Sequence, residues 1–565
     1  MLPQLYERRP FKVRNADEYN LDEVLELFVN PLIGYRNPFE YENNIVKGKM
    51  GTGKTMYLKA NYVFYLYSMI PSLIEKEPLY LPVFLKLNDF QHIKRPDEIY
   101  RSIILSIVEN ILKLYLDLRN VDKMVAIHCG VRSLPSNVLK VQKFDKVMSE
   151  IIKLNADEYV KTIKHSFNVA GSVAAKFLEL SSRLEKEEAV EIRKKSNPGI
   201  ADVKMIYEYL LRETGGRVLL LIDEAAALDK SFFREKGGAE PSFFEILMNQ
   251  LRTQDFIRTK IAVYPNSFSD ILAETRYGDV VSLEDDVMEE DGYTAFRGKT
   301  IDIVGKYLSN VAERKIEVDE VFDLNTAGKG DCIEQIINGS GGTMRRLVQL
   351  LDLSMLAARE RNGGNGKVEG KDTLEGLKKQ AQNMEEKYTA PDREFLHDIL
   401  RVCRKRGSYK FQFPYKAPVL SKYLFKSEEQ NILQVVETGM GRRGTTYAFD
   451  YVYCVFQDIP THFLIGTERI DKERSRKTGR WIPRIIKISK DLIEQAGLQG
   501  KIDGNIEYVH KGIGITKGDD GKDYFLTNDH VIESDKNKHF VAGKRVRFYP
   551  AVIQGAAVAL NVEIL

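Results

Sequence analysis

The first 290 residues alternate short, continuous apolar runs with longer segments in which apolar side chains recur every three or four positions. Continuous runs of this length predict buried strands, and the spacing of three or four predicts helices that cover them. The expected strands lie at 45–46, 79–87, 217–224, 260–264 and 279–283, and the clearest helices at 56–67, 96–118 and 243–252. This alternation is typical of a doubly wound parallel sheet, where ligands bind at the carboxyl ends of the strands.

The loop after the first strand carries a phosphate-binding pattern, because residues 48–55 fit the template G-x-x-x-x-G-K-[ST]. Glycines let backbone N–H groups point at the phosphates of a nucleotide, which also face the positive end of the following helix. Lys54 would then reach the β- and γ-phosphates, and the Thr55 hydroxyl would bind Mg²⁺. An ordinary glycine-rich turn is the alternative, but a strand precedes the loop and a helix follows it. The expected nucleotide contacts are Gly48, Lys49, Met50, Gly51, Thr52, Gly53, Lys54 and Thr55.

Polar side chains follow two later strands of the predicted sheet. Asp223 and Glu224 end the apolar run 217–224, where Asp223 can hold Mg²⁺ and Glu224 can polarise an attacking water. Asn266 follows the strand at 260–264 and is the candidate for orienting that water. The alternative interpretation of the acidic pair is a strand that merely ends in solvated carboxylates.

Two arginines are candidates for contact with the phosphates. Arg276 lies just before the last strand, on the expected flank of the domain, where it would stabilise transition-state charge or remain a surface residue. Arg345 follows a glycine-rich turn at 339–342 and opens a helix that can fold back over the phosphate loop. Arg346 is the alternate for this contact, and two solvated arginines on a lid helix are the other possibility.

Length and composition limit the class of protein. The chain has 565 residues, of which 43% are hydrophobic and 29% charged, so we expect several globular domains. Its net charge of +3 is too small to indicate a nucleic-acid partner, which must be argued from local clusters. The four cysteines are far apart and without C-x-x-C spacing, which argues against zinc or disulfides. No secretory or membrane-spanning segment is apparent, so we expect a cytoplasmic protein without a membrane partner.

The order of these motifs resembles that of AAA+ ATPases. Residues 48–55, Asp223 with Glu224, Asn266, Arg276 and 342–346 stand in the order of Walker A, Walker B, sensor 1, arginine finger and sensor 2. The stretch 341–351 looks most like the origin-recognition (initiator) branch. The resemblance implies ATP and Mg²⁺ as cofactors, a homo-oligomer, and a lead-in segment at 15–40 that packs near the adenine base. A charged helical insertion at 119–199 departs from that branch.

The resemblance also divides the chain. We expect an α/β P-loop NTPase core at 1–290, a helical lid at 291–388, a winged-helix-like α+β module at 389–462, a basic linker at 463–502 and a small all-β OB barrel at 503–565.

The winged-helix-like module is expected to contain helices at 393–405 and 417–425, followed by a hairpin of strands at 431–437 and 445–455. The tip of that hairpin carries Arg442 and Arg443, which are candidates for contact with DNA or RNA phosphates. Contact with protein is the open alternative. The basic segment that follows the module is interpreted as a solvated linker rather than a nucleic-acid arm.

Residues 503–565 resemble a cold-shock domain, whose barrel stacks single-stranded bases on aromatic side chains. Tyr508, Phe525 and Tyr524 are the aromatic residues expected to remain on that platform. Ile513 and Ile515 replace two platform aromatics, and each lost stack forfeits about 1–3 kcal/mol. We therefore expect a retained fold with weak nucleic-acid binding, or a face used for protein contact.

Together these patterns predict a Mg²⁺-dependent, oligomeric ATPase of AAA+ type that acts on nucleic acid or a nucleoprotein assembly. The catalytic candidates are Lys54, Glu224, Asn266 and Arg276, and the metal candidates are Thr55 and Asp223. The alternative is an ATP-operated switch or scaffold that recruits a separate effector protein, as in bacterial antiviral defence ATPases. A protein that holds ATP without hydrolysing it is the third possibility.

Overall fold

The computed structural model describes most of the chain, with gaps. The described residues are 1–32, 37–75, 77–118, 199–212, 215–224, 228, 232, 242–264, 278–287, 290–324, 331–406, 408–413, 420, 423–424, 431–437, 445–459, 485–488, 501–510, 512–527, 530–531, 541–553 and 556–565. The expected insertion at 119–199, apart from Gly199, lies outside these residues, as do Asn266, Arg276, Arg442 and Arg443. Most of the expected helix at 417–425 and most of the basic segment at 463–502 also lie outside them.

A five-stranded parallel sheet forms the first unit, in the strand order β2-β3-β4-β1-β5. Its strands are β1 (Asn44–Lys47), β2 (Tyr80–Lys86), β3 (Arg217–Asp223), β4 (Ile257–Val263) and β5 (Asp279–Ser282). The predicted parallel α/β sheet is therefore confirmed. In the register, Lys86 of β2 stands beside Asp223 of β3, and Lys47 of β1 stands beside Val263 of β4. Polar residues at the carboxyl ends of separate strands are thus brought to one edge.

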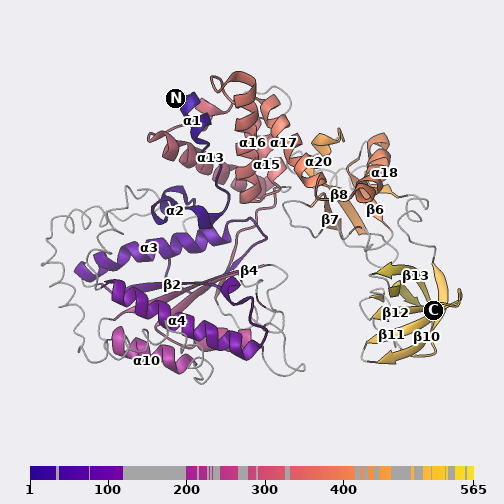
Figure 1. The fold of residues 1–565 in the computed structure, drawn as a ribbon, viewed down its shortest axis with the longest axis horizontal. Coiled ribbons are helices and arrows are strands. Elements are labelled where there is room, and N and C mark those ends of the chain that lie inside the picture. Colours follow the sequence, from indigo (N-terminus) through magenta and orange to yellow (C-terminus); the bar gives the residue numbers. More distant parts are fainter. Residues whose placement is uncertain are drawn as a thin grey trace.

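Helices cover both faces of this sheet, as Figure 1 shows. Successive strand residues point to opposite faces, so Leu219 and Leu221 pack with α2 and α3, whereas Leu220 and Ile222 pack with the helices on the other face. The covering helices are α2 (Leu21–Leu27), α3 (Lys54–Glu75), α4 (Pro96–Leu118), α10 (Ile200–Leu210) and α11 (Phe243–Arg252). The short 3-10 helix η2 (Leu87–Phe90) follows β2.

A helical unit follows the sheet in the chain, at the residues where the lid was expected. Its helices are α13 (Glu290–Ala312), α14 (Val318–Val321), α15 (Cys332–Ser340), α16 (Met344–Asn362) and α17 (Gly370–Glu385). Helix α13 begins at Glu290, near the start of the expected lid, and Tyr293 and Phe296 belong to its buried face. The core formed by α13 and α15–α17 also includes residues of the N-terminus.

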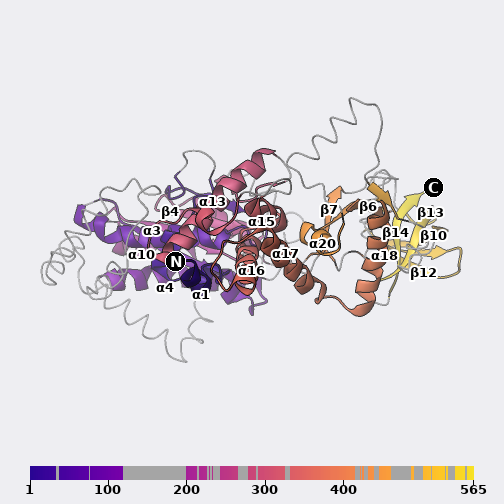
Figure 2. The ribbon, with the colours of Figure 1, turned by 90° about the horizontal axis from the view of Figure 1, so that it is seen from above.

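The N-terminal segment connects the two units. Helix α1 (Leu2–Arg8) packs on α13 and α16 rather than on the sheet, and both views in Figures 1 and 2 place it with the helical unit. The short helix η1 (Ala16–Glu18) instead contacts α3 of the first unit. The segment between α1 and η1 therefore crosses from one unit to the other, a connection that the sequence pattern does not reveal.

In the described part of the region expected to be winged-helix-like, a four-stranded sheet is accompanied by two helices. Its strand order is β7-β8-β6-β9. The elements are α18 (Ala390–Arg406), β6 (Lys410–Phe413), β7 (Leu433–Glu437), β8 (Thr445–Phe449), α20 (Tyr451–Phe456) and β9 (Ile485–Lys487). The predicted hairpin exists as the antiparallel pair β7 and β8, while β6 was not foreseen and β9 lies within the expected linker.

The prediction of one strand over 445–455 is wrong in its second half. Strand β8 ends at Phe449, and the Asp450 carboxylate accepts a hydrogen bond from the Val452 backbone N–H at 3.0 Å. This bond caps helix α20, because it satisfies a backbone donor that a helix start leaves open. An aspartate in the middle of an apolar run therefore separates strand from helix.

The C-terminal residues form the predicted small closed barrel, with the strand order β10-β11-β12-β14-β13. Its strands are β10 (Ile502–His510), β11 (Ile513–Gly518), β12 (Asp523–Thr527), β13 (Arg545–Ile553) and β14 (Ala556–Ile564). All strands are antiparallel to their neighbours except the parallel pair β12 and β14. Among the described residues, no helix is long and apolar enough to span a membrane.

Candidate functional site

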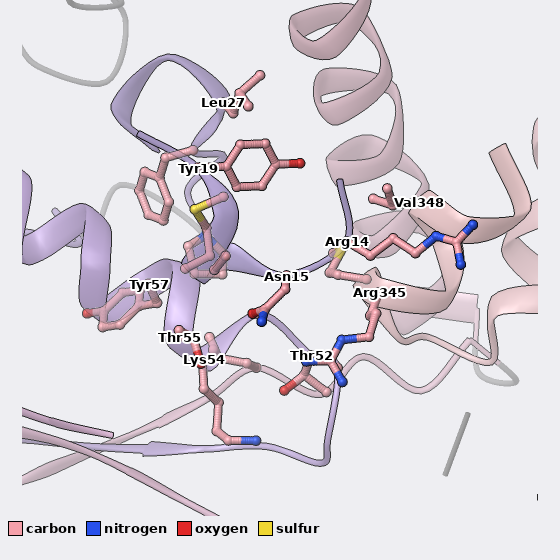
Figure 3. Close-up of a pocket in the computed structure, with 18 of the residues that line it drawn as sticks. Arg14, Asn15, Tyr19, Leu27, Thr52, Lys54, Thr55, Tyr57, Arg345 and Val348 are labelled. Atoms are coloured by element: carbon pink, nitrogen blue, oxygen red, sulfur yellow. The ribbon is translucent and has the colours of Figure 1, made fainter. Parts of the chain in front are cut away.

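A pocket of about 360 Å³ lies where the carboxyl ends of the strands meet the helical unit. The phosphate loop, Asp223 with Glu224, and Arg345 all contribute to its walls. The other walls come from the N-terminal segment and from helix α13, and Figure 3 shows several of these side chains around one space. Residues far apart in the sequence are thus gathered around a single cavity.

The phosphate loop has the conformation that its glycines allow. Gly51 and Gly53 adopt φ angles of 82° and 97°, in the left-handed region that L side chains rarely enter. The Thr52 hydroxyl donates a hydrogen bond to the Lys49 carbonyl at 2.9 Å and curls the loop on itself. A Cβ at Gly48 would lie 2.4 Å from that hydroxyl, so a larger residue there would displace the Thr52 side chain.

Lys54 is held at the mouth of the loop. Its ammonium donates hydrogen bonds of 2.7 Å to the carbonyls of both Gly48 and Lys49. The same nitrogen lies 4.1 Å from the centre of the Tyr264 ring, which follows strand β4. These contacts fix the ammonium beside the loop's backbone N–H groups, where a phosphate would meet both. The lysine and its loop therefore form one positively charged end of the pocket.

The two carboxylates lie at the neighbouring strand end. Asp223 is buried, and one of its oxygens accepts a hydrogen bond from the Glu224 backbone N–H at 2.8 Å. Glu224 adopts φ 59°, so the chain turns sharply after β3 and carries this side chain into the pocket. Burial, and then the charge of Asp223, raise the pKa of the Glu224 carboxyl. A higher pKa makes this carboxylate a better acceptor of a proton.

The second oxygen of each carboxylate fits a cation. Asp223 Oδ2 and Glu224 Oε2 are buried and, within the described part of the chain, have no hydrogen-bond partner. A buried carboxylate oxygen without a partner costs free energy, which a bound cation or ordered water would offset. Thr55 lines the same pocket and supplies a hydroxyl. Hydroxyl and carboxylate oxygens are the ligands that Mg²⁺ prefers, so this donor set fits the ion.

Neighbouring arginines on α16 have different environments. The Arg345 backbone N–H donates to the Gly51 carbonyl at 3.0 Å, and its side chain extends toward Thr52 (Figure 3). Arg346, the alternate in the sequence prediction, is buried and donates two hydrogen bonds to the Asp450 carboxylate. The geometry therefore brings Arg345 to the phosphate loop and directs Arg346 away from it.

The opposite end of the pocket is apolar and was only partly foreseen. Leu27, Tyr307 and Val348 line it with Tyr19, whose hydroxyl is 3.2 Å from that of Tyr307. An apolar, aromatic wall of this kind suits the flat face of a nucleotide base. The lead-in segment was expected near the base, but no motif in the sequence indicates that side chains of α13 also line the pocket. Its apolar spacing is that of any helix buried on one face.

Two further cations beside the pocket were missed from sequence. Lys299 forms an ion pair with Asp285 at 2.8 Å, and Arg14 lies 3.4 Å from Asp352 on α16. Both basic residues line the pocket, and Figure 3 shows the Arg14 guanidinium turned toward Val348 rather than toward Lys54. No motif marks these residues, because each is positioned by an acid on another element.

The barrel presents a second candidate surface. Tyr508, Ile515 and Phe525 stand side by side on β10, β11 and β12, and their exposed fractions are 57%, 40% and 42%. The expectation that Tyr524 remains on this platform is wrong, because Tyr524 is 4% exposed and packs inside the barrel against Phe548. Alternation along β12 places Tyr524 inward and Phe525 outward.

Comparisons with known proteins add little. Neither protein-family models nor curated protein sequences give a match to this chain. Among solved structures, the chain is similar to the ORC2 protein of Aeropyrum pernix in its ADPNP–ADP complexes. The TM-score is 0.30 and the identity 11%, over 80% of this chain and 97% of that chain. A TM-score this low carries no argument about fold or function.

Proposed function

We propose that this protein is a Mg²⁺-dependent ATPase of the P-loop class. One observation supports this above all: a single pocket is lined by the phosphate loop, the acidic pair after β3 and Arg345. Binding of a triphosphate needs the first, and its hydrolysis needs a base beside it. The size and apolar end of the pocket match a nucleotide with a base at one end and phosphates at the other.

Each polar residue has a proposed role. Lys54 and the N–H groups of the loop bind the phosphates, and Arg345 contacts the same charge from the helical unit. Thr55 and Asp223 would hold Mg²⁺, whose charge would offset that of the phosphate oxygens. Glu224, whose side chain lines the pocket beside Asp223, accepts the proton of the attacking water. Asn266 and Arg276 keep their proposed roles in orienting that water and stabilising transition-state charge.

Replacing the proposed base tests the function directly. Glu224→Gln keeps the shape of the side chain but cannot accept a proton, so turnover is expected to fall about 100-fold or more while ATP binding persists. Phosphate release and binding of a fluorescent ATP analogue measure the two quantities separately. The exposed Glu375 of α17 offers a matched control, since Glu375→Gln changes the same group outside the pocket. Hydrolysis that continues unchanged in Glu224→Gln excludes this role.

We further propose that the ATPase is of AAA+ type, assembles into a homo-oligomer and acts on nucleic acid. Support comes from the order of the sequence motifs and from the helical unit that brings Arg345 to the phosphate loop. Arg442, Arg443 and the barrel are the proposed contacts with DNA or RNA. Oligomeric mass with and without ATP, and hydrolysis with and without single- and double-stranded DNA, test this proposal.

A second candidate function is an ATP-operated switch that recruits a separate effector protein. The exposed Ile513 and Ile515 on the barrel favour it, because aliphatic side chains offer no aromatic stack to a base. Under this alternative, DNA neither binds in a salt-dependent manner nor stimulates hydrolysis, and a defined protein partner associates stably.

A further inference from the structure

An acidic residue outside every sequence motif joins the N-terminal segment to the pocket. Asp17 lies in η1 and lines the cavity. Its two carboxylate oxygens form separate ion pairs of 2.7 Å, one with Lys59 of α3 and one with Lys86 at the end of β2. Lys59 also donates to the Ala16 carbonyl at 3.0 Å. Helix α3 begins at the phosphate loop, and Lys86 stands beside Asp223 in the register.

These ion pairs are partly shielded from water. The exposed side-chain fractions are 27% for Asp17, 16% for Lys59 and 34% for Lys86. Burial alone would raise the pKa of Asp17, but the hydrogen bonds from both lysines outweigh burial and lower it. A carboxylate that bridges two lysines from separate elements fixes position better than an exposed single pair, which usually contributes little.

The other end of the same segment is attached to the helical unit. Arg9 donates two hydrogen bonds to the Asp352 carboxylate, at 2.7 and 3.2 Å, and Arg14 approaches the same acid. Asp352 is buried on α16, the helix that carries Arg345. Residues 9–19 therefore form a strap that is attached to α16 at one end and, through Asp17, to α3 and β2 at the other.

The strap supplies part of the apolar end of the pocket. Val13 and Tyr19 line the cavity, and the Tyr19 hydroxyl donates to the Val13 carbonyl at 2.9 Å, which closes the strap on itself. Tyr19 also packs edge-on against Tyr307, with ring centres 6.2 Å apart. If Asp17 loses its lysines, the side of the strap that faces the sheet has no other ion pair among the described residues. The wall that would cover the base then loses its ionic attachment to the sheet and keeps the hydrogen bond from Lys59 to the Ala16 carbonyl.

We propose that Asp17 is a positioning residue for nucleotide binding, which holds the N-terminal strap across the pocket by bridging Lys59 and Lys86. The proposal rests on the function proposed above. Asp17 does not touch the reacting phosphates; it acts through the strap. Its loss is therefore expected to weaken the binding of ATP rather than the chemical step.

The test compares ATP affinity and turnover in the full-length chain. In Asp17→Asn, the Kd and KM for ATP rise about tenfold, while kcat at saturating ATP stays within about twofold of the parent. Asp17→Glu retains the charge and restores most of the affinity, and Lys59→Met, which removes one of the two ion pairs, gives an intermediate Kd. The matched control is Asp97→Asn, because Asp97 of α4 also pairs with two basic residues, Arg95 and Arg101, but does not line the pocket.

The outcomes separate this inference from the function. A parent chain and Asp97→Asn variant that bind no ATP overturn both. A parent that binds ATP, together with Asp17→Asn and Lys59→Met variants of unchanged affinity, overturns the role of Asp17 alone. An equal loss of kcat and affinity in Asp17→Asn, not restored by Asp17→Glu, also contradicts positioning of the strap, and unfolding midpoints identify any variant that fails to fold.

Discussion

A single buried lysine makes the stability of the first unit depend on pH. Lys260 of β4 is fully buried, and its amine donates to the Asn61 side chain at 2.8 Å and to the Pro38 carbonyl at 3.0 Å. Burial, opposed by the charges of Glu42 and Glu40, lowers the pKa of Lys260 to about 7. The amine joins the strand, helix α3 and the loop before β1, at the cost of burying an ionisable group.

This lowered pKa predicts a pH dependence of stability. Between pH ~7 and pH ~10.4 the unfolded lysine binds a proton that the folded one has released, so the free energy of unfolding rises with pH in that window. Below pH ~7 both states are protonated, and the cost of burying the charge is fully present. Relative to Lys260→Met, the parent therefore gains stability as pH rises, on the order of a few kcal/mol.

Chemical denaturation of parent and variant across this pH range measures the difference. Lys204→Met on α10 is the control, because Lys204 is exposed on the same unit and should give a flat difference. A stability difference between parent and Lys260→Met that stays flat or falls from pH ~7 to pH ~10.4 would show that the buried amine keeps its proton, and would contradict the lowered pKa.

Helix α16 carries two adjacent arginines whose functions the structure separates. Arg345 meets the phosphate loop through its backbone, whereas Arg346 pairs with Asp450, and both members of that pair are 3% exposed. Asp450 also accepts hydrogen bonds from Val452 and from Gln434. The turn between α15 and α16 is also constrained, since a Cβ at Gly342 would lie 2.6 Å from the Asp285 carbonyl. Helix α16 thus contacts the nucleotide pocket and the four-stranded sheet module in successive residues.

Replacing Arg346 is expected to lower stability, whereas replacing Arg345 is expected to weaken ATP binding. Arg346→Met leaves the Asp450 carboxylate buried without its cation and should lower the free energy of unfolding by about 3–5 kcal/mol. Arg345→Met should leave stability nearly unchanged and raise the Kd for ATP. Denaturation and nucleotide titration of both variants measure these effects. Adding Asp450→Asn to Arg346→Met removes the unpaired charge and should restore part of the stability; the same loss from both arginine variants contradicts the assignment.

The sequence predicts the strands and helices of the first unit better than it predicts which residues from other elements complete the pocket. Long apolar runs such as 217–224 are read correctly because burial on both faces leaves little alternative. The residues that complete the pocket, such as Asp17, Lys299 and Tyr307, have no local signature, because their role depends on which element folds beside them. Strand β9 is missed for the same reason, since three residues in a basic segment become a strand only by pairing with β6.

At the scale of the whole molecule, the units differ in how closely they are joined. The helical unit and the four-stranded sheet module share one hydrophobic core, in which Leu347 and Leu377 belong to the same cluster as Phe411 and Tyr453. A change at the pocket that moves α16 therefore acts on both together. The barrel has its own core around Leu526 and Phe548, while Val558 of β14 belongs to the larger cluster. We expect the helical unit and the four-stranded sheet module to respond to nucleotide as one body, which would move the hairpin of β7 and β8 with the pocket.

The barrel itself has no overall charge with which to attract nucleic acid. Residues 501–565 contain nine lysines and arginines and nine aspartates and glutamates, so the net charge is zero. Stacking on the exposed row of Tyr508, Ile515 and Phe525 is then the contribution to single-strand affinity that this face can be tested for. Ile515 lies between the two aromatic rings in the register and interrupts the platform.

Restoring an aromatic residue at this position tests whether the face accepts bases. Ile515→Phe should tighten binding of a labelled oligothymidylate about tenfold, because one added stack is worth about 1–3 kcal/mol. Fluorescence anisotropy at fixed salt measures this, and Val541→Phe is the control, since Val541 is also exposed on the barrel but outside the row. A gain confined to Ile515→Phe indicates a base-stacking face that Ile515 interrupts. No gain, or an equal gain in the control, favours protein contact, because an aliphatic row gives a partner apolar area to bury without any requirement for stacking.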